Sequence, residues 1–163
     1  MNAKNISKLL GLGEEYVKGV LDIALLKTPE EAGRMYSNCS EEMETALMKK
    51  WVELTEEAIQ LLKNPEEAKN LYINCPPKTR PVVMDKWVEL TMKAISLLKN
   101  PEEAKNLYYN CPPKMKPAVM KKWVELTEEA IQLLKNPEEA KNLYYNCPPK
   151  MQPAIILFLQ SQE

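Results

Sequence analysis

Apolar residues recur along the chain with the spacing of amphipathic helices, and prolines interrupt the pattern at regular intervals. From Val119 to Leu134 the apolar side chains follow one another at intervals of three and four residues, with lysine and glutamate between them. This spacing places an apolar stripe on one face of a helix and charge on the other. The pattern therefore predicts a long amphipathic helix here and at two equivalent places earlier in the chain.

A shorter helix is predicted after each long one by a capping motif. Asn-Pro-Glu-Glu begins at Asn64, Asn100 and Asn136, and Thr-Pro-Glu-Glu begins at Thr28. The Asn or Thr side chain caps free amides, and proline suits the first helical position. The following glutamates can bond back to the cap and favour the positive end of the helix dipole. Each later short helix should end at a Cys-Pro-Pro sequence, because proline cannot continue it.

The start of the later long helices is open between two versions. In the first, the helix begins at Pro77, and Pro81 one turn later produces a bend or a brief 3₁₀ entry. In the second, the helix begins at Pro81. We favour the first version, because the upstream copy has Ser40-Glu41 in place of Pro76-Pro77 and predicts one uninterrupted helix capped by Ser40.

The whole pattern repeats with a period of 36 residues and no insertions. The second of three similar copies keeps 28 of the 36 residues of the first. A fixed period in this range is typical of solenoids, whose terminal units diverge because they face water. The sequence predicts an all-α, right-handed solenoid of about four helix-turn-helix repeats with alternating long and short helices. Its single domain, 1–163, would comprise a capping repeat 1–49, the copies 50–85, 86–121 and 122–157, and a truncated helix 158–163.

The order of certain residues in each copy resembles the tetratricopeptide repeat. Trp51-x₂-Leu54, then Ala68-x₃-Tyr72-x₂-Cys75, then Pro81 follow the Trp, Leu, Ala, aromatic, small residue and Pro of that family. The later copies hold the same residues at equivalent positions. The departures are the longer period, Thr55 in place of a glycine, Ala58 in place of a tyrosine, and the proline pair that ends the second helix. The resemblance covers most of the chain and implies a scaffold that binds a protein or peptide without catalysing a reaction.

The resemblance also implies which residues line a concave peptide-binding face. In the first similar copy these are Lys49, Val52, Glu56 and Gln60. The next two copies, with Lys93 beside them, contribute the candidate peptide-binding residues Asp85, Val88, Met92, Lys93, Ser96, Lys121, Val124, Glu128 and Gln132. The middle copy has Met, Lys and Ser where both neighbouring copies have Glu, Glu and Gln. Any specific recognition is expected at those three positions.

Charge gives an alternative function. The chain has a net charge of −1, which argues against a surface that grips nucleic acid throughout. The middle copy alone carries seven basic and three acidic side chains, a net charge of +4. Binding of single-stranded RNA by this basic copy is therefore the weaker alternative to peptide binding.

The residue types needed for catalysis are scarce. The chain contains no histidine and no glycine-rich phosphate loop, so we expect no enzyme, no cofactor and no metal site. The four cysteines, one per repeat, are expected to be small buried thiols, too far apart in stacked hairpins to form disulfides. A redox or metal role is the minor alternative, because a cysteine near a helix N-terminus can have a lowered pKa. These residues are Cys39, Cys75, Cys111 and Cys147.

Both ends of the chain add expectations. No apolar run of membrane-spanning length and no signal-peptide pattern are present, which predicts a cytoplasmic type of protein without membrane contact. The near-identity of the copies fits either duplication or amplification of a consensus unit by engineering, and an engineered chain would have no native compartment or ligand. Ile155–Leu159 is apolar where solvated residues are expected, which predicts either an inward-folded plug or a surface for homo-oligomerisation.

Overall fold

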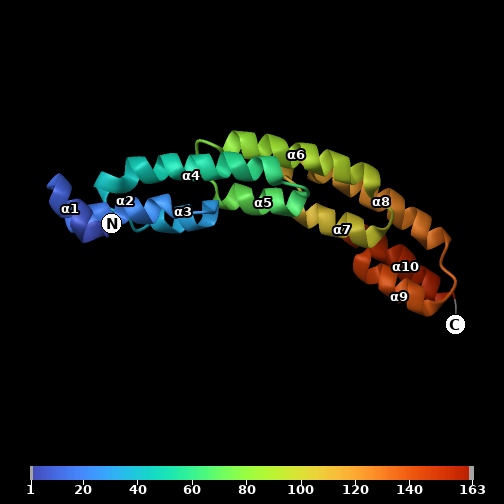
Figure 1. Cartoon of the computed structure of the whole chain (residues 1–163). Helices are drawn as coiled ribbons and strands as arrows, with labels where there is room; N and C mark the ends of the chain where they lie inside the picture. The colour runs from blue at the N-terminus through green and yellow to red at the C-terminus, as the bar shows by residue number, and fades with distance from the viewer. Residues whose placement is uncertain (1, 162–163) are drawn as a thin grey trace. The chain divides into compact units, whose positions relative to one another are not determined.

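The computed structural model describes residues 2–161, which form α-helices and 3₁₀ turns and no β-strand (Figure 1). This confirms the all-α class. Met1, in the 1–49 segment, and Gln162 and Glu163, in the 158–163 segment, lie outside the described residues. The elements are α1 (Ala3–Leu10), α2 (Glu14–Ala24), α3 (Pro29–Tyr36), α4 (Glu41–Leu61), α5 (Pro65–Asn74), α6 (Arg80–Leu97), α7 (Pro101–Asn110), η1 (Pro113–Met115), α8 (Lys116–Gln132), α9 (Pro137–Asn146), η2 (Pro149–Met151) and α10 (Gln152–Gln160).

The helices belong to two compact units. The first contains the residues up to Leu62 together with Asn70–Met84, and the second contains Lys63–Lys69 together with the residues from Asp85 onward. Helices α5 and α6 therefore contribute to both. Within the first unit α3 packs along α4, and within the second α8 packs against α7 and α9, which also contacts α10. Each unit buries its own clusters of apolar side chains between paired helices.

The predicted helix caps are confirmed where the Pro-Glu-Glu motif stands. The side chains of Asn100 and Asn136 each accept a hydrogen bond of 2.9 Å from the backbone of the third helical residue. Thr28 does the same for α3 and completes a reciprocal capping box with Glu31. Ser40 was expected to cap α4, but its side chain makes no capping bond; only its carbonyl enters the helix, accepting from the Met43 amide at 2.9 Å.

Both versions of the long-helix start are partly right. The α-helix proper begins one residue before the later proline, at Arg80, Lys116 and Gln152. Before α8 and α10 the chain forms the expected 3₁₀ entry, which begins at the earlier proline as η1 and η2. Proline has no N–H to donate, so it is tolerated in the first turn of an α-helix, where that N–H would have no acceptor.

The tryptophans that recur in each copy are core residues in the second unit. Trp123 is 3% exposed and Trp87 is 5% exposed, whereas Trp51 in the first unit is only half-buried. The threonine four residues after each tryptophan is completely buried, and its hydroxyl donates to the tryptophan carbonyl at 2.8 Å. A buried hydroxyl is costly unless it is bonded in this way. Threonine thus fits where the tetratricopeptide pattern has glycine.

The proline pair leaves carbonyls at the end of each of the three later short helices without helical donors. At the end of α7, the carbonyls of Tyr108 and Tyr109 would accept from the residues four positions later, which are Pro112 and Pro113. The carbonyl of Asn110 lies at the last helical residue and is likewise beyond the regular ladder. Three consecutive acceptors therefore need partners from outside the helix.

Three side chains supply these partners in order. The Cys111 thiol lies 3.4 Å from the first carbonyl, the Lys69 ammonium donates to the second at 2.9 Å, and the Trp87 indole N–H donates to the third at 2.7 Å. The end of α9 has the same arrangement, at 3.4, 2.7 and 2.8 Å. The residues that donate there are Cys147, Lys105 and Trp123.

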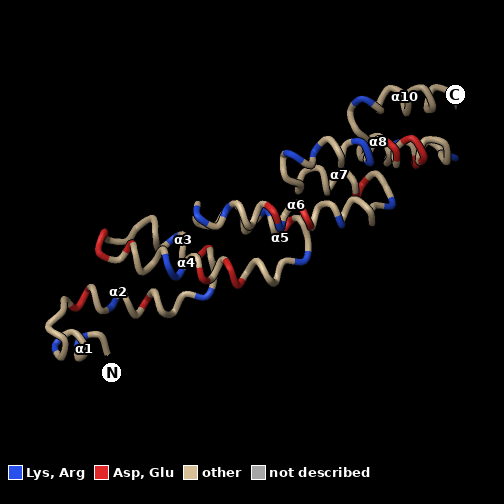
Figure 2. The backbone as a smooth tube through the Cα atoms, turned by 90° about the horizontal axis from the view of Figure 1, so that it is seen from above, with Lys and Arg blue, Asp and Glu red and all other residues tan. Residues whose placement is uncertain are grey.

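The C-terminal helix α10 buries some of its apolar residues and exposes others. Ile155 is fully buried, and Phe158 and Leu159 pack against the cluster formed with α9. On the other side Ile156 and Leu157 are 44% and 66% exposed. Helix α10 is tan along its length in Figure 2, because it contains no charged residue.

Replacing Trp123 with phenylalanine should lower the free energy of unfolding by about 2 kcal/mol, because apolar area is lost and the Asn146 carbonyl loses its donor. The same change at the half-buried Trp51 should cost about 1 kcal/mol, since less apolar area is involved. Urea denaturation followed by circular dichroism measures both variants. An equal or larger loss at Trp51 would contradict the burial argument.

Candidate functional site

The candidate peptide-binding residues all lie in the second unit, on α6 and α8. Val88 and Val124 are half-buried, and the remaining seven are exposed. Met92 is 61% exposed, which is unusual for a large apolar side chain in the middle of a helix. Helix α6 therefore presents an apolar residue to solvent at the position where the other copies have glutamate.

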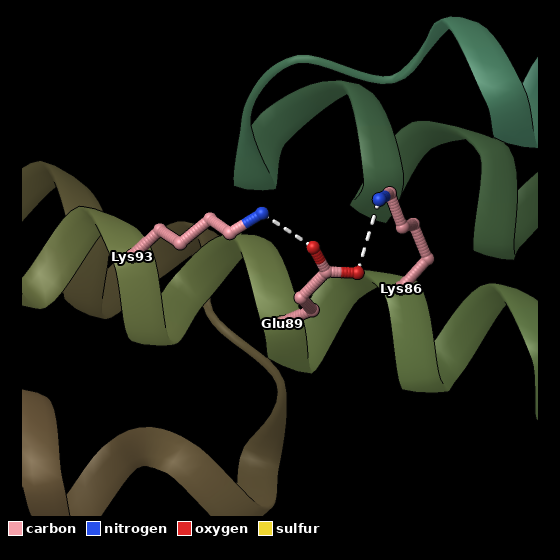
Figure 3. Close-up of polar contacts among 3 residues, drawn as sticks. All are labelled: Lys86, Glu89 and Lys93. Carbon is pink, nitrogen blue, oxygen red and sulfur yellow. Dashed lines mark hydrogen bonds and ion pairs between the residues drawn. The ribbon is translucent and has the colours of Figure 1, made fainter.

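An ion-pair network lies beside Met92 on the surface of α6. The Lys86 ammonium donates to the Glu89 carboxylate at 3.0 Å, and the Lys93 ammonium donates to the other oxygen of the same carboxylate (Figure 3). The hydrogen bonds from Lys93 and Lys86 lower the pKa of the Glu89 carboxyl from its ordinary value. Lys93, a charge that both neighbouring copies lack, is thus hydrogen-bonded to Glu89 on the same helix.

Ser96 has a local partner. Its hydroxyl donates to the Lys93 carbonyl at 2.7 Å, within the last turns of α6. The hydroxyl oxygen stays exposed to solvent and can still accept a hydrogen bond. Met92, Lys93 and Ser96 therefore form one exposed surface with apolar, basic and polar parts; we call it the Met92 surface.

The buried side of α6 meets α7 and α8 away from these residues. Ala94 and Ile95 pack against a cluster that includes Leu107 and Val119. The packing residues Ala94, Ile95 and Leu107 are the same in all three copies, whereas the exposed residues of the Met92 surface differ. These contacts pack α6 against α7 and α8 and leave Met92, Lys93 and Ser96 exposed to solvent.

In the first unit, the positions equivalent to Asp85 and Val88 border an open pocket of about 390 Å³. Lys49 and Val52 line it together with Met48 and Lys78. The resemblance to the tetratricopeptide pattern implied that Lys49 and Val52 line a peptide-binding face, and both residues border this pocket.

The cysteines are located as the packing interpretation expected. All four are free thiols; Cys75, Cys111 and Cys147 are buried and Cys39 is half-buried. Burial raises the pKa of the three buried thiols above its ordinary value, which disfavours the reactive thiolate. Their position next to a proline pair does not create an activated nucleophile.

Two further properties concern residues 2–161. No group of three or more histidine, cysteine, aspartate or glutamate side chains in this range is arranged to hold a metal ion. Over the same range, each helix is either too short or too polar to cross a bilayer.

Sequence reasoning missed an open pocket of about 650 Å³ in the first unit, beside α3 and the end of α5. Its wall includes Gly33, the half-buried Trp51, Ile73 and Asn74. The signal was present in the sequence, because Gly33 stands where the later copies have lysine. The effect of that difference depends on contacts between residues about 40 positions apart.

The raised pKa of the buried thiols predicts a pH dependence of stability. Thiols in the unfolded chain ionise near their ordinary pKa of about 9, whereas the folded chain keeps them protonated to higher pH. Their contribution to the free energy of unfolding is therefore complete below pH ~9 and decreases above it. Urea denaturation between pH 7 and about 10.5, compared with the variant in which all three become alanine, isolates this contribution. An identical decrease in both proteins would contradict it.

Known proteins give no guide to the function of this chain. No protein-family model, no curated protein and no solved structure matches this chain. The likeness to the tetratricopeptide pattern therefore rests on the repeated residues alone.

Proposed function

We propose that this protein is a non-catalytic, tetratricopeptide-like scaffold of helical hairpins that binds a peptide or protein partner through the Met92 surface. In this proposal the copies stack as a right-handed solenoid in one domain, and the first helix of each hairpin contributes to the binding face. One observation carries the proposal. Met92, Lys93 and Ser96 differ from the residues of both neighbouring copies and are exposed. The buried residues Trp87, Leu90 and Thr91 of the same helix are the same in all three copies.

The chemistry of the Met92 surface favours a partner with an apolar anchor and an acidic group. Methionine is flexible and polarizable, so an exposed methionine adapts to apolar side chains of different shapes. Lys93 is within reach of a carboxylate that replaces Glu89 as its partner, and the Ser96 oxygen accepts a backbone N–H. An extended acidic peptide with one large apolar side chain satisfies all three.

The ion pairs weigh against the RNA alternative. Lys86 and Lys93 share the carboxylate of Glu89, so part of the positive charge of this copy is neutralised on the helix itself. Single-strand binding also relies on aromatic platforms for the bases, and α6 offers Met92 instead of an aromatic side chain at the centre of the exposed surface.

A reciprocal exchange between copies tests the proposal. Peptides that bind the full chain are first selected from a random peptide library by phage display. The variant M92E/K93E/S96Q, which installs the residues of the neighbouring copies, should then weaken binding by tenfold or more, equivalent to at least about 1.4 kcal/mol. Isothermal titration calorimetry measures the affinity. The free energy of unfolding of this variant should differ from that of the unchanged chain by less than about 0.5 kcal/mol, because the replaced residues are exposed.

The matched control transfers the same three residues to α8, as E128M/E129K/Q132S. If recognition depends on these side chains, a chain that carries both sets of changes should regain part of the lost affinity. Selected peptides that bind the M92E/K93E/S96Q variant as tightly as the unchanged chain would rule out the Met92 surface as the binding site.

The exposed apolar pair of α10 supports a second interaction, between copies of this chain. Ile156 and Leu157 leave an uncharged apolar surface where the equivalent residue of the preceding copy is Lys121. An apolar surface on a helix of each copy can pair with itself about a two-fold axis. We therefore include homo-oligomerisation through Ile155–Leu159, with Ile155 as the buried support of the outer residues.

Light scattering should show a mass that rises with protein concentration towards a dimer. The variant L157K, which restores the lysine of the preceding copy, should remain monomeric over the same range because a charge cannot be buried unpaired at the contact. A mass that stays monomeric for the unchanged chain at millimolar concentration would exclude this self-association.

A further inference from the structure

The pocket beside Gly33 lies where the next two copies have a hydrogen-bonded lysine. In the second unit Lys69 extends from α5 to the end of α7 and places its ammonium 2.9 Å from the Tyr109 carbonyl and 3.2 Å from the Asn110 side-chain oxygen. Lys105 makes the same pair of contacts one copy later, at 2.7 and 3.5 Å. The fold thus contains two examples of an ammonium group held by one carbonyl and one amide oxygen.

The first unit has the acceptors of this site without its lysine. The residues equivalent to Tyr109 and Asn110 are Ile73 and Asn74, and the residue equivalent to Lys69 is Gly33. The Ile73 carbonyl has no helical donor, because the residues three and four positions later are Pro76 and Pro77. In the part of the chain that the structure describes, no side chain donates to it either.

The amide of Asn74 is oriented as in the filled sites. Its side-chain nitrogen donates to the carbonyl four residues earlier at 2.9 Å, as that of Asn110 does at 3.1 Å. The side-chain oxygen is therefore the atom left for a ligand. The Asn74 carbonyl already accepts the Trp51 indole N–H at 2.9 Å, which fixes the tryptophan ring next to both acceptors.

The space and the walls of the pocket suit a cation on an aliphatic chain. A side chain at position 33 would begin against the tryptophan, since an added Cβ would lie 3.0 Å from the Trp51 ring. The pocket is also lined by two acidic residues, Glu30 and Glu31, and by the basic residue Arg34. The Glu31 carboxylate already accepts hydrogen bonds from the backbone amides of Lys27 and Thr28. An ammonium group near an aromatic face is further stabilised by the ring quadrupole.

We propose that this pocket binds a primary alkylammonium group, with the ammonium donating to the Ile73 carbonyl and the Asn74 side-chain oxygen and the aliphatic chain lying against Trp51. The ligand reproduces what Lys69 and Lys105 do within the chain. It comes either from a lysine side chain of another protein or from a free alkylamine. This site is separate from the Met92 surface, so either one can fail without the other.

The test follows the three indole N–H signals of the ¹⁵N-labelled full chain by NMR, assigned with single Trp→Phe variants. Titration with Nα-acetyl-lysine-N-methylamide should move the Trp51 signal. The analogue acetylated at Nε has the same chain without the charge and should bind about tenfold more weakly or not at all. Butylammonium and a lysine-containing peptide distinguish the sources: equal affinity favours a free amine, and tighter binding of the peptide favours a protein.

Two variants convert one kind of copy into the other. Gly33→Lys supplies an internal ammonium and should abolish the response of Trp51, whereas Gly33→Ala adds only the Cβ and should retain it. Lys69→Ala empties an equivalent site and should make the Trp87 signal respond to the same ligand. If Gly33→Ala loses the response because its Cβ fills the pocket, the response gained by Trp87 in Lys69→Ala still tests the proposal.

The proposal is overturned by any of three results. These are a response of Trp51 to the Nε-acetylated analogue as strong as that to the charged ligand, an undiminished response in Gly33→Lys, and a silent Trp87 signal in Lys69→Ala. A wild-type chain whose Trp51 signal does not move with millimolar ligand would equally exclude the site.

Discussion

The requirement that every backbone carbonyl find a donor organises this molecule. A Cys-Pro-Pro sequence ends the later short helices and removes the N–H groups that the last carbonyls would have used. A thiol, an ammonium and an indole N–H replace them, at the ends of α7 and α9 alike. Two of these three donors come from other helices, so satisfying the end of a short helix also fixes its packing against its neighbours.

This arrangement explains which residues the copies share. The tryptophan is an apolar anchor and also a donor, the lysine is a surface residue that reaches a carbonyl about 40 positions away, and the cysteine combines small size with a weak S–H donor. In the second unit all three groups are already engaged in these structural contacts. Met92, which differs from the residue of both neighbouring copies, has no such structural contact and lies on the surface.

The same requirement makes the divergent first copy informative. Where Gly33 stands in place of lysine, the Ile73 carbonyl has no side-chain donor among residues 2–161, and a pocket remains beside a half-buried tryptophan. In the second unit the corresponding places are occupied by Lys69 and Lys105. Divergence at the first copy thus has a chemical consequence beyond exposing one side of it to water.

The sequence by itself determined the helices, because capping, apolar spacing and proline placement act within a few residues. It located Asn100, Asn136 and Thr28 as caps correctly, and it placed Met92, Lys93 and Ser96 on an exposed face. The prediction that the Ser40 side chain caps α4 was wrong. The sequence also left open whether the later long helices begin at the position of Pro77 or of Pro81. Only the tertiary structure decided which side chain meets which orphan carbonyl. Those contacts join residues 23 and 40 positions apart, and such distances become contacts only when the helices pack.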